Sequence, residues 1–181
     1  MPSTHSEVVF LRQKYALMKN LLILITLSCL AFLACNKEKI LSYEEQLDLD
    51  IVKIDDYLNS KGIKNEYQIT ASSLYYKITD EGNADGVKPG FFSTVTIKYK
   101  GYFFNGEVFD ETEGTKVAQF AVNDNTLIAG FREGLQLLNK KGKVTIILPS
   151  GLAYGRRGAG GEPPIPPDTP IIFDLELVDF F

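Results

Sequence analysis

The strongest constraint on the fold of this 181-residue chain is a set of period-two hydrophobic patterns that begins after residue 72. Apolar and polar residues alternate in four segments, at residues 74–79, 95–103, 144–148 and 171–177. Alternation of this kind predicts strands that bury one face. Asn105-Gly106, between two apolar runs, adds the signal for a hairpin turn. Together these patterns predict antiparallel strands over most of residues 73–181.

A helical pattern interrupts the strands. The residues that share one helical face are Phe131, Leu135 and Leu138. Lys140-Lys141-Gly142 is predicted to form the C-terminal cap. Gly130 and Gly134 each lower helix stability by about 1 kcal/mol relative to Ala, so core packing must hold this helix in place. We therefore expect an α+β domain whose antiparallel β-sheet wraps around one short helix.

A second helical pattern precedes the strands. Ser42 and Glu45 have the spacing of a capping box, and Gly62 suits the position just after a helix. The apolar face between them is formed by Leu47, Ile51, Ile54 and Leu58. The pattern predicts a helix over residues 43–61 within an N-terminal helical extension, residues 42–72. Its apolar face must pack on the following domain or on a second copy, which would make a dimer. The acidic residues of its other face, expected to be solvated, are Asp48, Asp55 and Asp56.

The start of the chain carries targeting signals. An apolar run over residues 21–34 follows Lys19 and ends at Cys35. The run is shorter than the roughly 20 residues of a membrane-spanning helix, and its layout is typical of a secretory signal. It resembles a bacterial lipoprotein signal, in which Cys35 is lipidated and becomes the new N-terminus. The resemblance implies a leader over residues 1–34 and a lipidated tether over residues 35–41. The alternatives are an uncleaved anchor and an ordinary signal with an incidental Cys.

A lipoprotein of this kind is expected at the bacterial cell envelope, held to a membrane through its lipid. Asn36 stands where an Asp would resemble an inner-membrane retention signal, so we expect the outer membrane, with the periplasmic and surface faces both open. Met18 is an alternative start of the chain, because Met18-Lys19-Asn20 would itself begin a compact signal.

Composition excludes several classes of function. A net charge of −4 argues against nucleic-acid binding, which needs a basic surface. The one histidine is His5, so zinc sites and His-dependent catalytic triads are nearly excluded, and we expect no metal and no cofactor. Two Cys residues cannot build a disulfide framework.

Five segments carry a more specific pattern. In chain order they are Tyr99–Tyr102, Gly106–Asp110, Leu127–Leu135, Leu148–Gly155 and Ile165–Pro170. Together they resemble the FKBP-type peptidyl-prolyl isomerases, the immunophilins that bind macrolide drugs. The resemblance covers residues 73–181 and implies a prolyl isomerase domain that acts on proline-containing protein clients. It also implies binding of macrolide immunosuppressants. Phe131 stands where many family members have Trp, which alters the floor on which a macrolide would bind.

The resemblance also implies roles for individual residues. The residues expected to line a proline pocket are Tyr99, Phe109, Phe120, Leu127, Ile128, Phe131, Tyr154, Ile165 and Phe173. Phe131 is expected to form the floor, while the Ile128 N–H and the Tyr154 hydroxyl are expected to bind ligand carbonyls. Asp110 is expected to contact Tyr99 and to act electrostatically rather than as a general base. Lys116 is the one basic residue available to support Asp110.

The implied reaction suits a chain with these residues. Rotation about a peptide bond faces a barrier of roughly 18–20 kcal/mol, which arises from amide resonance. Twisting the amide makes it less polar, so an apolar cage binds the twisted state better than the planar one. The alternatives are a proline-peptide-binding or chaperone module with negligible turnover, and a dimer of the helical extension with a vestigial pocket. Aromatic residues at strand spacing are, taken singly, more often core residues.

Overall fold

The computed structural model describes residues 12–15, 17–19, 40–83 and 86–181. The chain forms two compact units, Met1–Ile40 and Leu41–Phe181. In the first unit, residues 12–15 and 17–19 are helical and exposed. The apolar run at residues 21–34, Cys35 and the tether up to Lys39 lie outside the described residues. None of the helices in the described part of the chain is long and apolar enough to span a membrane.

The second unit begins with helix α2, Tyr43–Lys61, whose bounds match the predicted ones. Ser42 and Glu45 form a complete capping box: the Glu45 N–H donates to Ser42 Oγ at 3.1 Å, and the Ser42 N–H donates to the Glu45 carboxylate at 2.8 Å. Gly62 ends the helix in the left-handed conformation, with φ of 70°. A 3₁₀ turn, η1 (Lys64–Glu66), leads from α2 into the sheet.

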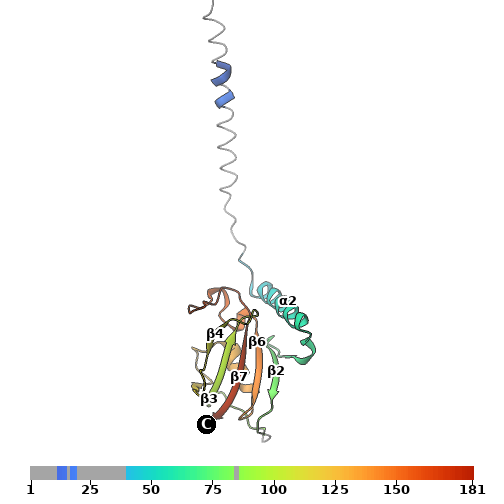
Figure 1. The fold of residues 1–181 in the computed structure, drawn as a ribbon, viewed down its shortest axis with the longest axis vertical. Coiled ribbons are helices and arrows are strands. Elements are labelled where there is room, and N and C mark those ends of the chain that lie inside the picture. Colours follow the sequence, from blue (N-terminus) through green and yellow to red (C-terminus); the bar gives the residue numbers. More distant parts are fainter. Residues whose placement is uncertain (1–11, 16, 20–39, 84–85) are drawn as a thin grey trace, which may run out of the picture. The chain divides into compact units, whose positions relative to one another are not determined.

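The sheet is antiparallel throughout its described pairs. Its path runs in the order β1-β2-β6-β7-β3-β4, and β5 pairs with β3 beyond that path. The strands are β1 (Gln68–Ile69), β2 (Tyr75–Asp80), β3 (Thr94–Tyr102), β4 (Val108–Glu111), β5 (Ala118–Ala121), β6 (Lys143–Leu148) and β7 (Ile171–Phe180). Figure 1 shows the long central strands β6, β7 and β3 side by side. Sequence periodicity did not predict the short strands β1 and β5.

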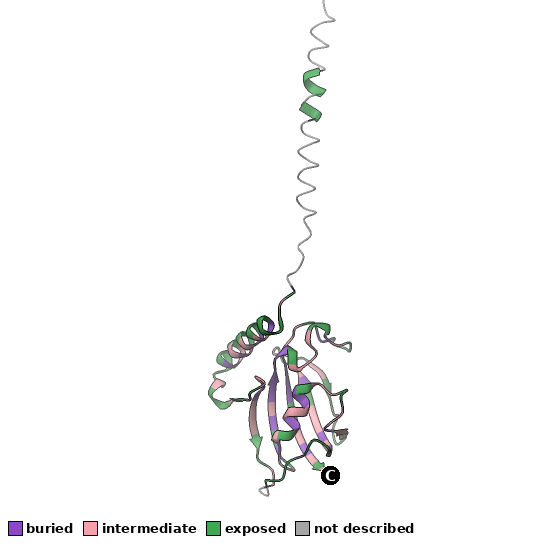
Figure 2. Ribbon diagram, turned by 180° about the vertical axis from the view of Figure 1, so that it is seen from behind, coloured by how far each residue is buried: buried purple, intermediate pink, exposed green. Residues whose placement is uncertain are grey.

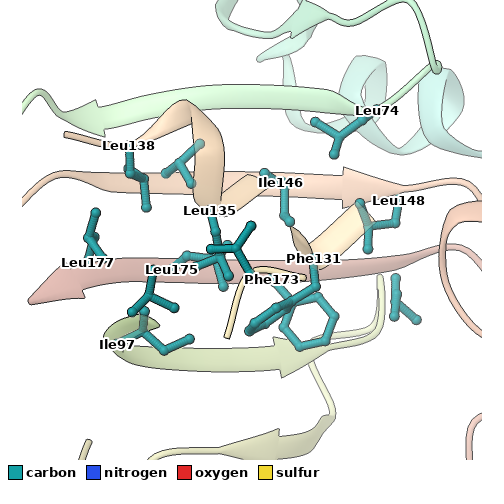
Figure 3. Packing of buried hydrophobic residues seen from close by; sticks show 14 of the residues in the cluster. Leu74, Ile97, Phe131, Leu135, Leu138, Ile146, Leu148, Phe173, Leu175 and Leu177 are labelled. Atoms are coloured by element: carbon teal, nitrogen blue, oxygen red, sulfur yellow. The ribbon is translucent and has the colours of Figure 1, made fainter. Parts of the chain in front are cut away.

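Helix α3, Ala129–Leu137, packs across one face of this sheet, as Figure 2 shows. The buried side chains beneath it come from alternate strand positions, including Ile97, Ile146, Phe173 and Leu175 (Figure 3). The two helical glycines permit this close approach, since a Cβ on Gly130 would lie 2.4 Å from Leu148 and one on Gly134 would lie 2.7 Å from Ile146. The predicted fold class, an antiparallel sheet wrapped around one short helix, is confirmed.

The predicted C-terminal cap of α3 is wrong. The helix ends at Leu137, and Leu138 is already extended, with ψ of 138°. Residues 140–142 instead form a turn into β6, in which Lys141 has φ of 66° and the Gly142 N–H donates to the Asn139 carbonyl at 2.9 Å. A glycine is typical both of a helix C-terminal cap and of a turn that leads into a strand, so the local sequence pattern could not separate these two structures.

Helix α2 packs against the opposite face of the same sheet. Its side chains Ile54 and Leu58 are fully buried against Tyr75, Ile147 and Ile172. The chain neighbours of these strand residues, such as Leu74, Ile146 and Phe173, point to the opposite face and belong to the core beneath α3. Both faces of β2, β6 and β7 are therefore covered where α2 packs. The Ile54 and Leu58 half of the predicted stripe therefore packs on its own chain, whereas Leu47 and Ile51 are only half-buried. Asp55, predicted to be solvated, is half-buried and accepts from the Tyr75 hydroxyl.

Candidate active site

A pocket of about 200 Å³ opens on the α3 face of the sheet. Strands β3, β4, β5 and β7 contribute to it, together with the N-terminal end of α3 and the segment after β6. Its lining residues are Tyr99, Asp110, Phe120, Thr126, Leu127, Ile128, Phe131, Tyr154 and Phe173. Eight of these nine were predicted from the sequence, and Thr126 was not.

Phe131, in the first turn of α3, is the centre of the aromatic cluster. Its ring is 5% exposed and meets three other rings edge to face. The centroid distances are 5.7 Å to Tyr99, 6.0 Å to Phe120 and 5.1 Å to Phe173, with interplanar angles of 81–88°. Edge-to-face contacts are a favoured arrangement of aromatic pairs, so the three neighbours fix the orientation of the Phe131 ring. Figure 3 shows Phe131 and Phe173 side by side.

Two residues predicted for the pocket do not line it. Phe109 meets Phe173 edge to face, with the ring centroids 5.5 Å apart, and Ile165 is buried, with 6% exposed. Phe109 and Phe173 approach the chain closely at Gly101, where a Cβ would lie 2.5 Å and 2.6 Å from their rings. Phe109 therefore contacts the pocket residue Phe173, and only glycine suits position 101.

Polar groups stand at one side of the pocket. The Tyr99 hydroxyl donates to Asp110 Oδ2 at 2.9 Å, as β3 and β4 pair Gly101 with Asp110. Burial, assisted by the neighbouring Asp110 carboxylate, raises the pKa of Tyr99 well above its ordinary value of 10. Burial also raises the pKa of Tyr154, and Asp110 adds to that rise. Both phenols therefore remain protonated donors at neutral pH.

The segment before α3 is shaped by a local hydrogen-bonded turn. Asp124 Oδ1 accepts from the Thr126 N–H at 2.8 Å and from the Thr126 hydroxyl at 2.7 Å. These bonds hold the pKa of Asp124 below its ordinary value. Ile128 is the N-cap residue of α3, so its N–H lies outside the helical hydrogen-bond ladder at the edge of the pocket. The Asp-x-Thr spacing was the signal that could have identified Thr126.

Lys116 does not support Asp110. Its ammonium group pairs with Glu113 at 2.9 Å, and both side chains are exposed. Within the described residues, no group of His, Cys, Asp and Glu side chains could hold a metal ion. Residues 40–181 also contain neither His nor Cys. The pocket is thus an aromatic hollow edged by phenol hydroxyls, one carboxylate and a helix N-terminus, which suits an apolar ring flanked by carbonyl groups.

The fold and this pocket define a small binding domain for such a ligand. The chain belongs to a family with that architecture: residues 86–178 match the family model of FKBP-type peptidyl-prolyl cis-trans isomerases. This finding agrees with the resemblance seen in the five sequence segments.

Individual relatives point to the same family. The chain is 36% identical over 137 residues to "Outer membrane protein MIP" of Legionella longbeachae, an alignment that covers 75% of this chain and 56% of the relative. It is also 36% identical over 127 residues to "Probable FKBP-type peptidyl-prolyl cis-trans isomerase FkpA" of Neisseria meningitidis, covering 70% of this chain and 44% of the relative. The chain thus spans about half the length of these curated relatives.

A solved structure shares the fold. The crystal structure of FkpA from Escherichia coli aligns with 99% of this chain and 74% of its own, with a TM-score of 0.62 and 24% identity. The likeness at this level of identity concerns the fold alone.

Proposed function

We propose that this protein is a peptidyl-prolyl cis-trans isomerase that accelerates rotation about X-Pro bonds. The observation that carries the proposal is the Phe131-centred aromatic pocket, with the Tyr99–Asp110 pair at its edge. A pyrrolidine ring is apolar and compact, and the roughly 200 Å³ of the pocket suits one such ring with its flanking atoms. Membership of the FKBP-type family supports the same assignment.

The reaction requires neither a nucleophile nor a metal. Amide resonance accounts for a barrier of roughly 18–20 kcal/mol, and twisting the bond removes that resonance and makes the carbonyl less polar. An apolar pocket binds this twisted state better than water does, whereas the planar amide is better solvated by water. The difference in binding lowers the barrier, which is catalysis by preference for the transition state. Phe131, Phe120 and Phe173 supply the apolar surface in this account.

The polar groups of the pocket hold the substrate while its bond turns. We assign the Tyr154 hydroxyl and the Ile128 N–H as donors to substrate carbonyls. Asp110 contributes through its charge, oriented by the Tyr99 hydroxyl, toward the changing dipole of the twisting amide. Phe109 acts indirectly in this proposal, through its ring contact with Phe173, and Ile165 contributes as a buried core residue.

The cellular setting of the proposal rests on the sequence. Lipidation of Cys35 would hold the domain at the bacterial envelope, where exported proteins fold, and one relative carries the name "Outer membrane protein MIP". Stable anchoring needs more than one acyl chain, as a single chain binds a membrane only marginally. Mass spectrometry of the mature N-terminal peptide tests this: a lipidated Cys35 supports the anchor, and an unmodified Cys35 contradicts it.

Macrolide binding and dimerisation are further parts of the proposal. A macrolide would occupy the same pocket, and its affinity depends on a floor made by Phe131. A dimer through α2 would have to use the exposed face of that helix, where Leu49 and Val52 are 48% and 57% exposed, because Ile54 and Leu58 are buried against the sheet. Displacement of a proline peptide by a macrolide and light scattering of the full-length chain test these two points.

Exchange spectroscopy on a peptide with one X-Pro bond tests the activity. Uncatalysed isomerisation takes roughly 10–100 s at 25 °C, and we expect micromolar protein to shorten it clearly. The matched variant Phe131→Leu keeps an apolar floor but removes the aromatic contacts, so it should retain folding and lose part of the acceleration. Peptide binding without acceleration would instead favour the alternative of a proline-peptide-binding or chaperone module.

A further inference from the structure

The carboxylate of Asp50, on helix α2, is fully buried. A buried carboxylate is tolerated only where hydrogen bonds and opposite charge replace its water. Asp50 Oδ1 accepts from Gln46 Nε2 at 2.8 Å and lies 3.4 Å from Lys53 Nζ. Asp50 Oδ2 accepts from the backbone N–H of Ser150 at 2.7 Å. The last bond joins residues 100 positions apart, so it links α2 directly to the segment after β6.

Ser150 begins the segment that carries Tyr154 into the pocket. It is the first residue of the 3₁₀ turn η2, Ser150–Leu152, in which the Ala153 N–H donates to the Ser150 carbonyl at 2.9 Å. Ala153 ends this turn, and Tyr154 comes next, directly before η3, Gly155–Arg157. The bond from Asp50 therefore fixes the start of a five-residue segment, 150–154, that ends at a pocket residue. Tyr43 adds a packing contact, since a Cβ on Gly151 would lie 2.6 Å from its ring.

A second bond from α2 reaches the far side of the same segment. Lys53 Nζ donates to the Asp168 carbonyl at 3.3 Å. The Asp168 N–H in turn donates to the Gly155 carbonyl at 2.9 Å, directly after Tyr154. Asp50 and Lys53, which are themselves in contact, thus hold the chain on both sides of Tyr154.

We propose that Asp50 is a positioning residue for the pocket: it fixes the Ser150–Gly155 segment and, through it, the Tyr154 hydroxyl. The proposal rests on the proposed isomerase function. Attachment of α2 to the sheet does not depend on this carboxylate alone, because Ile54 and Leu58 pack on the sheet and the Tyr75 hydroxyl donates to Asp55 at 3.1 Å. Through this carboxylate α2 positions a pocket residue, although the helix packs on the sheet face opposite the pocket.

The same helix supplies a matched control. Asp50→Ala removes the bond to Ser150, whereas Asp55→Ala removes a bond to β2 that does not touch the Tyr154 segment. Asp50→Asn is the conservative variant, as its amide oxygen can still accept from the Ser150 N–H while Gln46 turns its own amide to accept from the new NH₂. Lys53→Met removes the bond to Asp168 and serves as the second test should Asp50→Ala fail to fold.

The variants are compared in the full-length chain, at a temperature where urea unfolding shows each to be folded. We expect Asp50→Ala to lower kcat/KM for X-Pro exchange by about tenfold, the rate equivalent of one lost charge-assisted hydrogen bond. The kcat/KM of Asp50→Asn and of Asp55→Ala should remain within about twofold of the wild-type value. Lys53→Met should lower kcat/KM by an amount between about twofold and about tenfold. Wild-type kcat/KM in Asp50→Ala, or an equal loss in Asp55→Ala, would overturn the proposal.

A second readout separates this proposal from the proposed function. The NMR signals of ¹³C-labelled Tyr154, assigned by the loss of a signal in Tyr154→Phe, should move in Asp50→Ala and stay in place in Asp55→Ala. If the wild type does not accelerate exchange, the isomerase function fails, and the Tyr154 signals alone still decide whether Asp50 positions the segment. Unmoved Tyr154 signals in Asp50→Ala contradict the positioning role in either case.

Discussion

The two faces of the sheet each carry a hollow and a tyrosine–aspartate pair, and they differ in chemistry. On the α3 face, Tyr99 donates to Asp110 beside an aromatic pocket of about 200 Å³. On the other face, the Tyr102 hydroxyl lies 3.4 Å from Asp174 Oδ1, beside a larger hollow of about 440 Å³. The charged residues that line this larger hollow are Lys98, Lys100, Glu111, Lys143, Asp174 and Glu176.

This difference shows why size does not identify the site. Several charged residues of the larger hollow pair with one another, as Lys143 does with Glu176 at 3.3 Å. Lys100, Glu111, Lys143 and Asp174 are exposed to water. A charged, wet surface stabilises the polar planar amide at least as well as the twisted one, so it gives no preference for the transition state. The smaller pocket is lined by five aromatic residues, so it favours the loss of amide polarity that the charged face does not.

The largest expected effect compares a core residue on each face. Phe131→Ala, in the pocket floor, should lower the free energy of unfolding by about 3–5 kcal/mol and abolish the acceleration of X-Pro exchange. Leu58→Ala, where α2 packs on the sheet, should lower the free energy of unfolding by about 2–5 kcal/mol. It should leave kcat/KM unchanged at any temperature where the protein is folded. Urea unfolding and peptide exchange measure the two quantities. Equal losses of kcat/KM in both variants would remove the distinction between the faces.

A smaller effect is expected from the two carboxylates. Asp110→Asn should lower kcat/KM by about tenfold, because it removes a charge beside the twisting amide. Asp174→Asn should leave kcat/KM within about twofold, and either change should alter the free energy of unfolding by less than about 1 kcal/mol, as both side chains are exposed. An unchanged rate in Asp110→Asn would refute its electrostatic role.

The smallest effect is expected from pH. The pKa values of Tyr99 and Tyr154 are raised by burial, so both hydroxyls stay protonated where free tyrosine would ionise. The profile of kcat/KM should therefore be flat over roughly pH 6 to 9. Above about pH 10 stability should fall, because these tyrosines ionise in the unfolded chain before they do in the folded one. A fall in kcat/KM with a midpoint inside the flat range would show that another ionising group takes part.

Local signals account for what the sequence predicted well. The bounds of α2 follow from the capping box at Ser42 and the left-handed Gly62, which are properties of a few neighbouring residues. The strands with clear alternation were found for the same reason, and five ordered segments were enough to place most of the pocket lining. Thr126 was missed because its contribution depends on a turn rather than on hydrophobic periodicity.

Long-range contacts account for what the sequence could not show. Strand β5 has four residues and pairs with β3 alone, so its pattern is too short to identify. Phe109 and Ile165 have suitable side chains, but three-dimensional packing places Phe109 against Phe173 and buries Ile165 in the core. Asp50 shares the helical face of Ile54 and Leu58, but helical periodicity cannot show that its carboxylate is fully buried there or that it accepts from the Ser150 N–H, 100 residues away.

One measurement tests the central claim, that the α3 face and not the opposite one binds the X-Pro bond. An unlabelled X-Pro peptide is titrated into ¹⁵N-labelled full-length protein, and the amide shifts are mapped on the sequence. We predict that the shifts centre on Ile128, Phe131 and Tyr154, with Thr145 and Asp174 unchanged. Shifts confined to Thr145, Asp174 and their neighbours on the charged face would contradict the account.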